Sequence, residues 1–161
     1  MDKVKFVLVG AGRAGMVHGR NLTGYIPEAE LVAIVDIDEN KARQSAEEVG
    51  VKKYSTNLDD ILKKEYIDAV CIGSLTFTHR EIVEKAADAG KHVFSEKPLA
   101  QNPEEAKKIK EVVEKTGIKF QIGFMRRYDP AIRKAYQMIQ DGIIGDLVMI
   151  KSTGRGPGLP P

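Results

Sequence analysis

The amino-acid sequence predicts an α/β fold, in which a doubly wound and mostly parallel sheet is covered by helices on both faces. Along residues 1–124, apolar runs that suit strands alternate with segments whose apolar residues recur at helical spacing. The runs are nearly continuous rather than alternating, which is typical of strands buried on both faces. A glycine-rich turn joins the first run directly to the first helical segment.

The expected strands follow the apolar runs of the chain. The first covers residues 3–9 and ends in Phe6-Val7-Leu8-Val9, and the second covers residues 31–36. Shorter runs predict three more strands, over residues 69–72, 92–95 and 119–124. Because parallel strands end at one edge of their sheet, the residues that follow these runs should gather there.

The expected helices lie between these strands. Residues 16–22 form a helix after the glycine turn, residues 40–49 form another that stops at Gly50, and a short one follows Asn57. Two later helices are predicted from their starting residues. Thr78 and Glu81 have the spacing of a capping box, and Asn102 is expected to cap a helix whose first residue is a proline.

Residues 125–161 depart from this alternation. Asp129-Pro130 opens a helix, Leu147-Val148-Met149-Ile150 suits a further strand, and six of the last eight residues are Gly or Pro. One interpretation is a disordered tail on a complete domain. We favour a chain interrupted inside a second, α+β domain, because the strand begins an element whose edges would be unpaired. We therefore expect one domain at residues 1–124, and a crossover helix with the start of a truncated domain at 125–161.

Composition excludes several classes of protein. A chain of 161 residues is long enough for about one domain with its own core. Its 25 Lys and Arg residues against 23 Asp and Glu residues give a net charge of +2, so neither nucleic acid nor a membrane surface is an expected partner. No apolar run approaches the ~20 residues of a membrane helix, and no signal-peptide pattern precedes the first strand. We expect a cytoplasmic protein.

The single cysteine and the three histidines do not suggest a metal site. Cys71 lies within an apolar run, so we favour a buried structural thiol over a nucleophile. The histidines are not spaced as metal ligands. His18 and His92 are interpreted as packing or supporting residues, whereas His79, near the start of a helix, is left open between a functional and a surface position.

The turn Gly10-Ala11-Gly12-Arg13-Ala14-Gly15 predicts a dinucleotide site. Its spacing is G-x-G-x-x-G, in which Gly10 suits a tight turn, Gly12 lets the backbone approach a pyrophosphate and Gly15 allows close contact between helix and strand. An ordinary glycine loop is the alternative for the turn alone. Asp36 strengthens the prediction because it ends the second strand, 21 positions after Gly15, where a carboxylate binds the ribose 2′-hydroxyl.

Asp36 also bears on the choice of cofactor. A carboxylate in that position repels the 2′-phosphate of NADP, and Lys41 and Arg43 lie too far along the next helix for a clear compensating role. NAD is therefore the expected cofactor.

Lys97 is the expected catalytic residue. It follows the strand at residues 92–95 and thus stands at the edge where ligands gather. An ammonium group there would donate hydrogen bonds to a substrate oxygen and favour its alkoxide-like state. The alternative is a solvated loop lysine. Pro98, beside the expected site, suits a cis peptide bond.

These segments together resemble the oxidoreductase family named after glucose-fructose oxidoreductase, inositol dehydrogenase and a rhizopine-catabolism dehydrogenase, written Gfo/Idh/MocA, and most of all its inositol dehydrogenase branch. The resemblance covers the nucleotide-binding half. The residues that carry it are Gly10 to Gly15 with His18, Asp36, Ile72-Gly73-Ser74, Thr78-His79, Gly90-Lys91-His92-Val93, Glu96-Lys97-Pro98-Leu99-Ala100 and Gly123-Phe124-Met125-Arg126-Arg127-Tyr128-Asp129-Pro130.

The resemblance implies an activity and further site residues. Members move hydride between a nicotinamide cofactor and a polyol or sugar, and carry a second, open-faced β-sheet domain through which they associate into oligomers. Lys97 would act with an aspartate and a histidine from that domain, and no matching position precedes Pro161. The implied cofactor contacts are Gly10, Gly12, Arg13, Ala14, Gly15, Asp36, Ser74, His79, Glu96 and Met125, with Glu96 near the nicotinamide ribose.

Arg127 is the expected contact on the substrate side. Adjacent residues in extended geometry point to opposite faces, so at most one of Arg126 and Arg127 would enter the pocket. A surface ion pair is the alternative for Arg127.

Three functions follow as hypotheses. The first is the NAD-binding half of a polyol or sugar dehydrogenase, most similar to inositol 2-dehydrogenase, that needs a missing half or a second chain for turnover. The second is a non-catalytic NAD-binding module that senses redox state or joins a partner subunit. The third is a scaffold independent of nucleotides.

Overall fold

The computed structural model describes residues 2–63 and 66–154, and the chain divides into two compact units, Met1–Gly123 and Phe124–Pro161. The boundary lies one residue before the expected one.

The first unit is built on a six-stranded parallel sheet. Its strands, in chain order, are β1 (Val4–Val9), β2 (Ala29–Val35), β3 (Lys53–Ser55), β4 (Ala69–Ile72), β5 (His92–Ser95) and β6 (Phe120–Ile122). Their order across the sheet is β3-β2-β1-β4-β5-β6, and all neighbouring pairs are parallel. From β1 the chain adds strands toward one edge of the sheet, and from β4 it adds them toward the other edge. The predicted doubly wound fold is confirmed.

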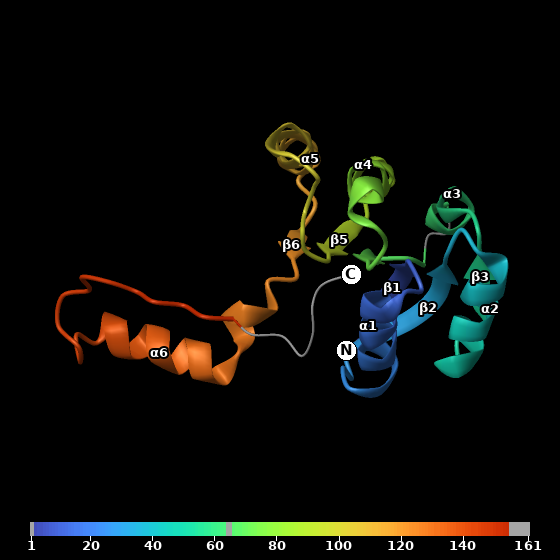
Figure 1. Ribbon diagram of the computed structural model, residues 1–161. Coiled ribbons are helices and arrows are strands. Elements are labelled where there is room, and N and C mark those ends of the chain that lie inside the picture. Colours follow the sequence, from blue (N-terminus) through green and yellow to red (C-terminus); the bar gives the residue numbers. More distant parts are fainter. Residues whose placement is uncertain (1, 64–65, 155–161) are drawn as a thin grey trace. The chain divides into compact units, whose positions relative to one another are not determined.

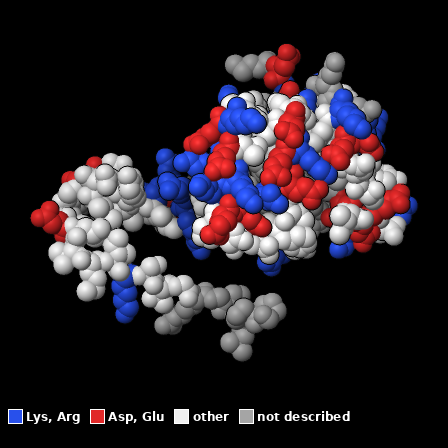
Figure 2. Space-filling view, turned by 90° about the horizontal axis from the view of Figure 1, so that it is seen from above, with Lys and Arg blue, Asp and Glu red and all other residues white. Residues whose placement is uncertain are grey.

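Five helices cover the two faces of this sheet (Figure 1). Helices α1 (Arg13–Gly24) and α2 (Glu39–Glu48) lie on one face. Helices α3 (Leu58–Leu62), α4 (His79–Asp88) and α5 (Pro103–Thr116) lie on the other. On the α3–α5 side, charged residues of both signs are interspersed over the surface (Figure 2).

The core consists of two layers, one on each side of the sheet. Alternate strand residues serve the two layers: Leu8 packs with Met16 and Leu22 under α1, whereas Val7 packs with Val83 and other residues of α3–α5. Both sets are buried, which explains why the apolar runs of the central strands are nearly continuous instead of alternating.

Side-chain caps fix the start of several helices. The carboxylate of Asp38 accepts hydrogen bonds from the backbone N–H groups of Asn40 and Lys41, and so starts α2. Asn102 caps α5 by accepting from the Glu105 N–H at 2.9 Å, as predicted.

In the first unit the capping box predicted at Thr78 is not formed, and one strand was not predicted. Thr78 is the N-cap residue of α4 as expected, but its side chain makes no capping hydrogen bond. It ends a short 3₁₀ helix, η1 (Thr76–Thr78), and its hydroxyl bonds the Leu75 carbonyl oxygen and the Ser74 hydroxyl instead. Strand β3 was not expected, because its three residues Lys53-Tyr54-Ser55 are polar and too few to form an apolar run.

The second unit contains a 3₁₀ helix, η2 (Met125–Tyr128), and α6 (Pro130–Gln140). Asp129 caps α6 as expected, with its Oδ1 accepting from the N–H groups of Ala131 and Ile132. Residues 147–150, which are among the described residues, do not form the predicted strand, and their apolar side chains are exposed. A strand needs a neighbour to pair with, and this segment pairs with none of the described strands. The Gly- and Pro-rich residues 155–161 lie outside the described residues.

Cys71 is buried in the α1-side layer, at 2% exposure, as predicted. Burial raises the pKa of its thiol to about 12, and the charge of Glu96 adds to the effect.

We expect this thiol to be unreactive in the folded chain. At pH 8 its thiolate fraction should lie roughly a thousandfold below that of a cysteine with the ordinary pKa of 9.0. A thiol reagent should therefore leave the native chain unmodified while it labels the denatured chain at one site. Rapid, complete labelling under native conditions would contradict the buried position.

Candidate functional site

The carboxyl edge of the sheet collects the predicted site residues of the first unit. Gly10 follows β1, Asp36 follows β2, Gly73 and Ser74 follow β4, and Glu96 begins the loop after β5. All these strands are parallel, so the loops after them lie at the same edge. The topology thus brings together residues that lie up to 86 positions apart.

The glycine turn is held by direct backbone packing. Gly10 has a φ of +93°, and a Cβ on it would lie 2.5 Å from the backbone of Ser74. A Cβ on Gly15 would lie 1.9 Å from the carbonyl oxygen of Gly10, and one on Gly73 would lie 2.6 Å from the Gly15 Cα. These three glycines are needed by the protein's own structure, because any side chain there would force the backbones apart.

Gly12 differs from these three glycines. It precedes α1 in extended geometry, with a φ of −78°, and a Cβ on it would meet nothing within 4 Å. The protein's own packing therefore gives no reason for a glycine at this position. The space that a Cβ would enter lies at the N-terminus of α1, where unpaired N–H groups and the helix dipole favour an anion. The turn from Gly10 to Gly15, with Arg13 and Ala14 in the first turn of α1, thus fits the pyrophosphate of a dinucleotide.

Asp36 is fixed against the glycine turn. Its Oδ2 accepts a hydrogen bond from the Ala11 N–H at 2.8 Å, and its Oδ1 accepts from the Asp38 N–H at 3.0 Å. A carboxylate has lone pairs left after two such bonds. Asp36 is therefore held in one orientation beside the turn, with acceptor capacity that suits a ribose hydroxyl.

Glu96 and Lys97 form the part of the edge after β5. Glu96 Oε1 lies 2.8 Å from His18 Nε2, and Glu96 Oε2 accepts from the Lys97 N–H at 3.1 Å. The side chain of Lys97 is exposed, and the peptide bond between Lys97 and Pro98 is cis, as predicted. The loop presents an ammonium group at the edge that carries the glycine turn and Asp36.

His79 is buried beside the turn after β4. Its ring is only 1% exposed, so the expectation of a surface histidine is wrong. Its Nε2 donates to the Ser74 carbonyl oxygen at 3.2 Å, and its Nδ1 lies 3.4 Å from the buried Ser95 hydroxyl. The buried ring therefore supports the turn after β4, and the cofactor contact expected at His79 stays a prediction.

The other two histidines hold backbone or side-chain groups in place. His92 Nδ1 accepts from the Lys119 N–H at 3.2 Å and so links the starts of β5 and β6. His18 packs its ring edge-on to Phe94, with 5.1 Å between the ring centroids. Both positions agree with the expected packing or supporting roles.

Met125 and Arg127 belong to the second unit. Both lie in η2 and are exposed, so the argument from extended geometry for Arg126 and Arg127 is wrong: the segment is helical. The surface ion pair considered for Arg127 is formed instead by Arg126, whose guanidinium lies 3.6 Å from Asp129. The roles of Met125 at the cofactor and Arg127 at the substrate stay predictions.

Three exposed apolar residues at the carboxyl edge were missed. Ile37, directly after Asp36, is 94% exposed, and Leu75 and Phe77, after β4, are 65% and 60% exposed. Large apolar side chains left in water beside a ligand site mark surface that a ligand can cover. The sequence does contain a signal for these residues, because each is an isolated apolar residue shortly after a predicted strand, at the carboxyl edge where ligands were expected.

The residues that the structure describes, 2–63 and 66–154, form neither a membrane-spanning helix nor a metal-binding cluster. No helix in these ranges is both long and apolar enough to cross a membrane. The same ranges contain no cluster of three or more His, Cys, Asp or Glu side chains that could hold a metal ion.

The fold and its edge define a dinucleotide-binding domain of the Rossmann type. The family model described as "Oxidoreductase family, NAD-binding Rossmann fold" (Gfo/Idh/MocA) matches residues 4–124. The chain belongs to this family, and the expected NAD-binding domain is confirmed.

Several similar proteins are inositol dehydrogenases. The scyllo-inositol 2-dehydrogenase (NAD⁺) of Bacillus subtilis is 41% identical over 99% of this chain and 46% of its own length. The myo-inositol 2-dehydrogenase of Thermotoga maritima is 36% identical over 96% of this chain and 46% of its own. The chain spans about half the length of these relatives.

The solved structures agree with this relationship. Scyllo-inositol dehydrogenase from Lactobacillus casei, with NAD(H) and scyllo-inositol bound, matches with a TM-score of 0.85 and 37% identity over 90% of this chain and 43% of that one. Myo-inositol dehydrogenase from the same organism, with NAD(H) and myo-inositol, matches with a TM-score of 0.84 and 36% identity over 89% of this chain and 43% of that one.

The glycine turn gives a matched pair of substitutions. Gly12→Ala should lower the free energy of unfolding by less than about 1 kcal/mol, because the added methyl meets no protein atom. The same methyl would obstruct a pyrophosphate, so NAD affinity should fall at least about tenfold. Gly15→Ala should instead destabilise the fold by about 3 kcal/mol or more. Urea unfolding and calorimetric titration with NAD check both; equal loss of stability in the two variants would contradict the assignment.

Asp36→Asn tests the ribose contact. Loss of the charge should weaken NAD binding about tenfold, since hydrogen bonds to charged groups contribute about 1.5–3 kcal/mol, and it should raise the NADP-to-NAD affinity ratio. Calorimetric titration with each nucleotide measures both. Asp38→Asn is the control, because it removes a nearby charge while asparagine still caps α2. Similar changes in both variants would argue for a general charge effect.

Proposed function

We propose that this chain is the cofactor-binding half of an NAD-dependent dehydrogenase that oxidises a ring hydroxyl of a polyol, most similar to inositol 2-dehydrogenase. The observation that carries the proposal is the loop Glu96-Lys97-Pro98, which presents an exposed lysine at the same sheet edge as the glycine turn and Asp36. The named activities of the relatives support it.

Different residues at the carboxyl edge would bind different parts of the dinucleotide. The N–H groups after Gly12 would bind the pyrophosphate, and Asp36 would bind the adenosine ribose. The exposed side chains of Ile37 and Leu75 would cover the adenine. Ser74 and Glu96, on the loops after β4 and β5, would border the nicotinamide half. Nicotinamide, when bound, supplies the hydride acceptor.

Lys97 would act on the substrate. Its ammonium would donate a hydrogen bond to the hydroxyl oxygen and favour the negative charge that grows there as the proton leaves. The groups that take the proton would come from outside these 161 residues, as the greater length of the relatives suggests. The exposed apolar residues of the second unit, among them Leu147, Val148 and Met149, support a further domain that covers them.

A chimaera tests the proposal. Residues 1–161 would be joined to the remaining part of the Bacillus subtilis scyllo-inositol 2-dehydrogenase, and NADH formation would be followed with scyllo- and myo-inositol. We expect activity in the chimaera, and a loss of at least about a hundredfold in kcat for Lys97→Ala with NAD affinity nearly unchanged. Lys91→Ala is the control, because Lys91 precedes the opposite end of β5.

The possible outcomes separate the hypotheses. A folded chimaera that binds NAD but oxidises neither inositol favours a non-catalytic NAD-binding module. A chain of residues 1–161 that binds no NAD favours a scaffold independent of nucleotides. Equal activity in the chimaera and its Lys97→Ala variant would remove Lys97 from the mechanism.

A further inference from the structure

A hydrogen bond joins the helix after the glycine turn to the loop that carries Lys97. His18 lies in the second turn of α1, three residues after Gly15, and its Nε2 is 2.8 Å from Glu96 Oε1. The two residues lie 78 positions apart in the chain. Their side chains are 22% and 19% exposed, so the bond is largely shielded from water.

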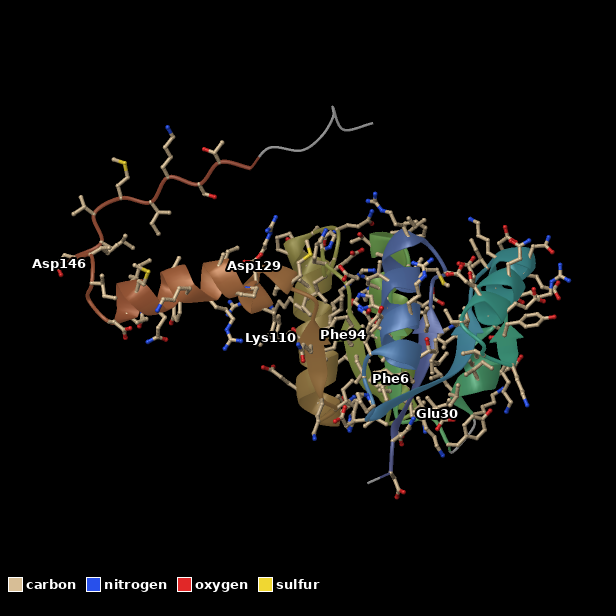
Figure 3. The ribbon with its side chains drawn as sticks, turned by 90° about the horizontal axis from the view of Figure 1, so that it is seen from below. Phe6, Glu30, Phe94, Lys110, Asp129 and Asp146 are labelled. Atoms are coloured by element: carbon tan, nitrogen blue, oxygen red, sulfur yellow. The ribbon has the colours of Figure 1, made fainter. Side chains whose placement is uncertain are left out.

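Neighbouring groups restrict both partners of this bond. The His18 ring meets Phe94 edge-on at an interplanar angle of 66°. Phe94 lies on β5, two residues before Glu96, and packs with the layer under α1 (Figure 3). Gly123 leaves the space that Glu96 occupies, because a Cβ there would lie 3.2 Å from Glu96 Oε1 and 3.1 Å from the Phe94 ring. The ring and the carboxylate therefore have little freedom to move apart.

The two oxygens of Glu96 serve different parts of the molecule. Oε1 faces His18, whereas Oε2 accepts the backbone N–H of Lys97 at 3.1 Å. An ionised carboxylate only accepts hydrogen bonds, so His18 Nε2 must carry a hydrogen and donate it. Glu96 thus links α1 to the backbone of Lys97 through two hydrogen bonds. Without His18, the carboxylate could turn toward water and leave the Lys97 N–H without its acceptor.

We propose that His18 is a positioning residue for Lys97. Its bond to Glu96 holds the loop after β5 at a fixed place relative to α1, the helix whose N-terminus receives the pyrophosphate. The distance between the bound cofactor and the Lys97 ammonium is then set by one chain of contacts: α1, His18, Glu96, Lys97. This inference rests on the proposed function, and it adds a residue that contacts neither the substrate nor the reacting atoms.

Three variants separate a hydrogen bond from mere packing. His18→Phe keeps a ring against Phe94 but removes the donor. His18→Gln retains an N–H group at nearly the distance of Nε2 from the backbone. Arg20→Gln is the control, because the ion pair from Arg20 to Glu48, at 2.6 Å, also links α1 to another element but leads to α2 and not to the loop.

The experiment measures the Lys97 amide by NMR in the chain of residues 1–161 without ligand. In His18→Phe, the hydrogen-exchange protection of this amide should fall at least about tenfold relative to amides of β4, and its proton resonance should move upfield as the bond to Glu96 is lost. His18→Gln should restore both readouts, and Arg20→Gln should change neither. The chemical shift gives the answer even where exchange is fast.

Contrary results would overturn the inference. An unchanged Lys97 amide in His18→Phe, no recovery in His18→Gln, or a uniform loss of protection over the whole sheet would each remove the positioning role. If His18→Phe does not fold, Gly123→Ala replaces it in the experiment. Its methyl would displace the Glu96 carboxylate and should lower the exchange protection of the Lys97 amide in the same way.

Calorimetry on the same proteins keeps the two proposals apart. A wild-type chain that shows the His18-dependent Lys97 signal but binds no NAD contradicts the proposed function alone. A chain that binds NAD, but whose Lys97 amide has the same exchange protection and chemical shift in His18→Phe as in the wild type, contradicts the inference alone. When both hold, NAD should shift the Lys97 amide resonance in the wild type and in His18→Gln, and should shift it less than half as far in His18→Phe.

Discussion

The close approach of three backbone segments at the carboxyl edge is the constraint on which the first unit depends. Gly10, Gly15 and Gly73 lie so near one another that a single methyl on any of them would overlap backbone atoms of another segment. Helix α1 is therefore seated directly on the ends of β1 and β4. The position of its N-terminus, and of every group carried by its first turns, follows from that contact.

The polar groups of the edge extend this arrangement outward. Asp36 is bonded to the turn through Ala11, and Glu96 is bonded to α1 through His18. The buried ring of His79 bonds the Ser74 carbonyl oxygen and lies 3.4 Å from the Ser95 hydroxyl, which is itself 3.2 Å from the Glu96 carbonyl oxygen. Loops from four strands thus form one connected network. Lys97 and the other solvent-exposed side chains at this edge therefore extend from loops whose backbones are fixed by hydrogen bonds.

Much of this was predictable from sequence because it depends on local sterics or strand order. The glycine spacing, the strand ends and the cap at Asn102 each reflect a few neighbouring residues, and the apolar runs indicate two covered faces. The burial of His79 and the bond between His18 and Glu96 depend on how distant segments pack, so no local pattern reveals them. The predictions for Thr78 and for residues 147–150 failed because they considered only neighbouring residues. The Thr78 hydroxyl is engaged by the preceding 3₁₀ helix, and residues 147–150 pair with none of the described strands.

The two hydrogen bonds accepted by Asp36 have a consequence for coenzyme engineering. The carboxylate that would repel a 2′-phosphate also holds the Ala11 N–H, in the middle of the proposed phosphate-binding turn. A small neutral replacement chosen to admit NADP would leave that amide to solvent and loosen the turn for either coenzyme. Redesign of coenzyme preference in this scaffold therefore has to supply a new acceptor for Ala11 together with a cation for the added phosphate, as two coordinated substitutions.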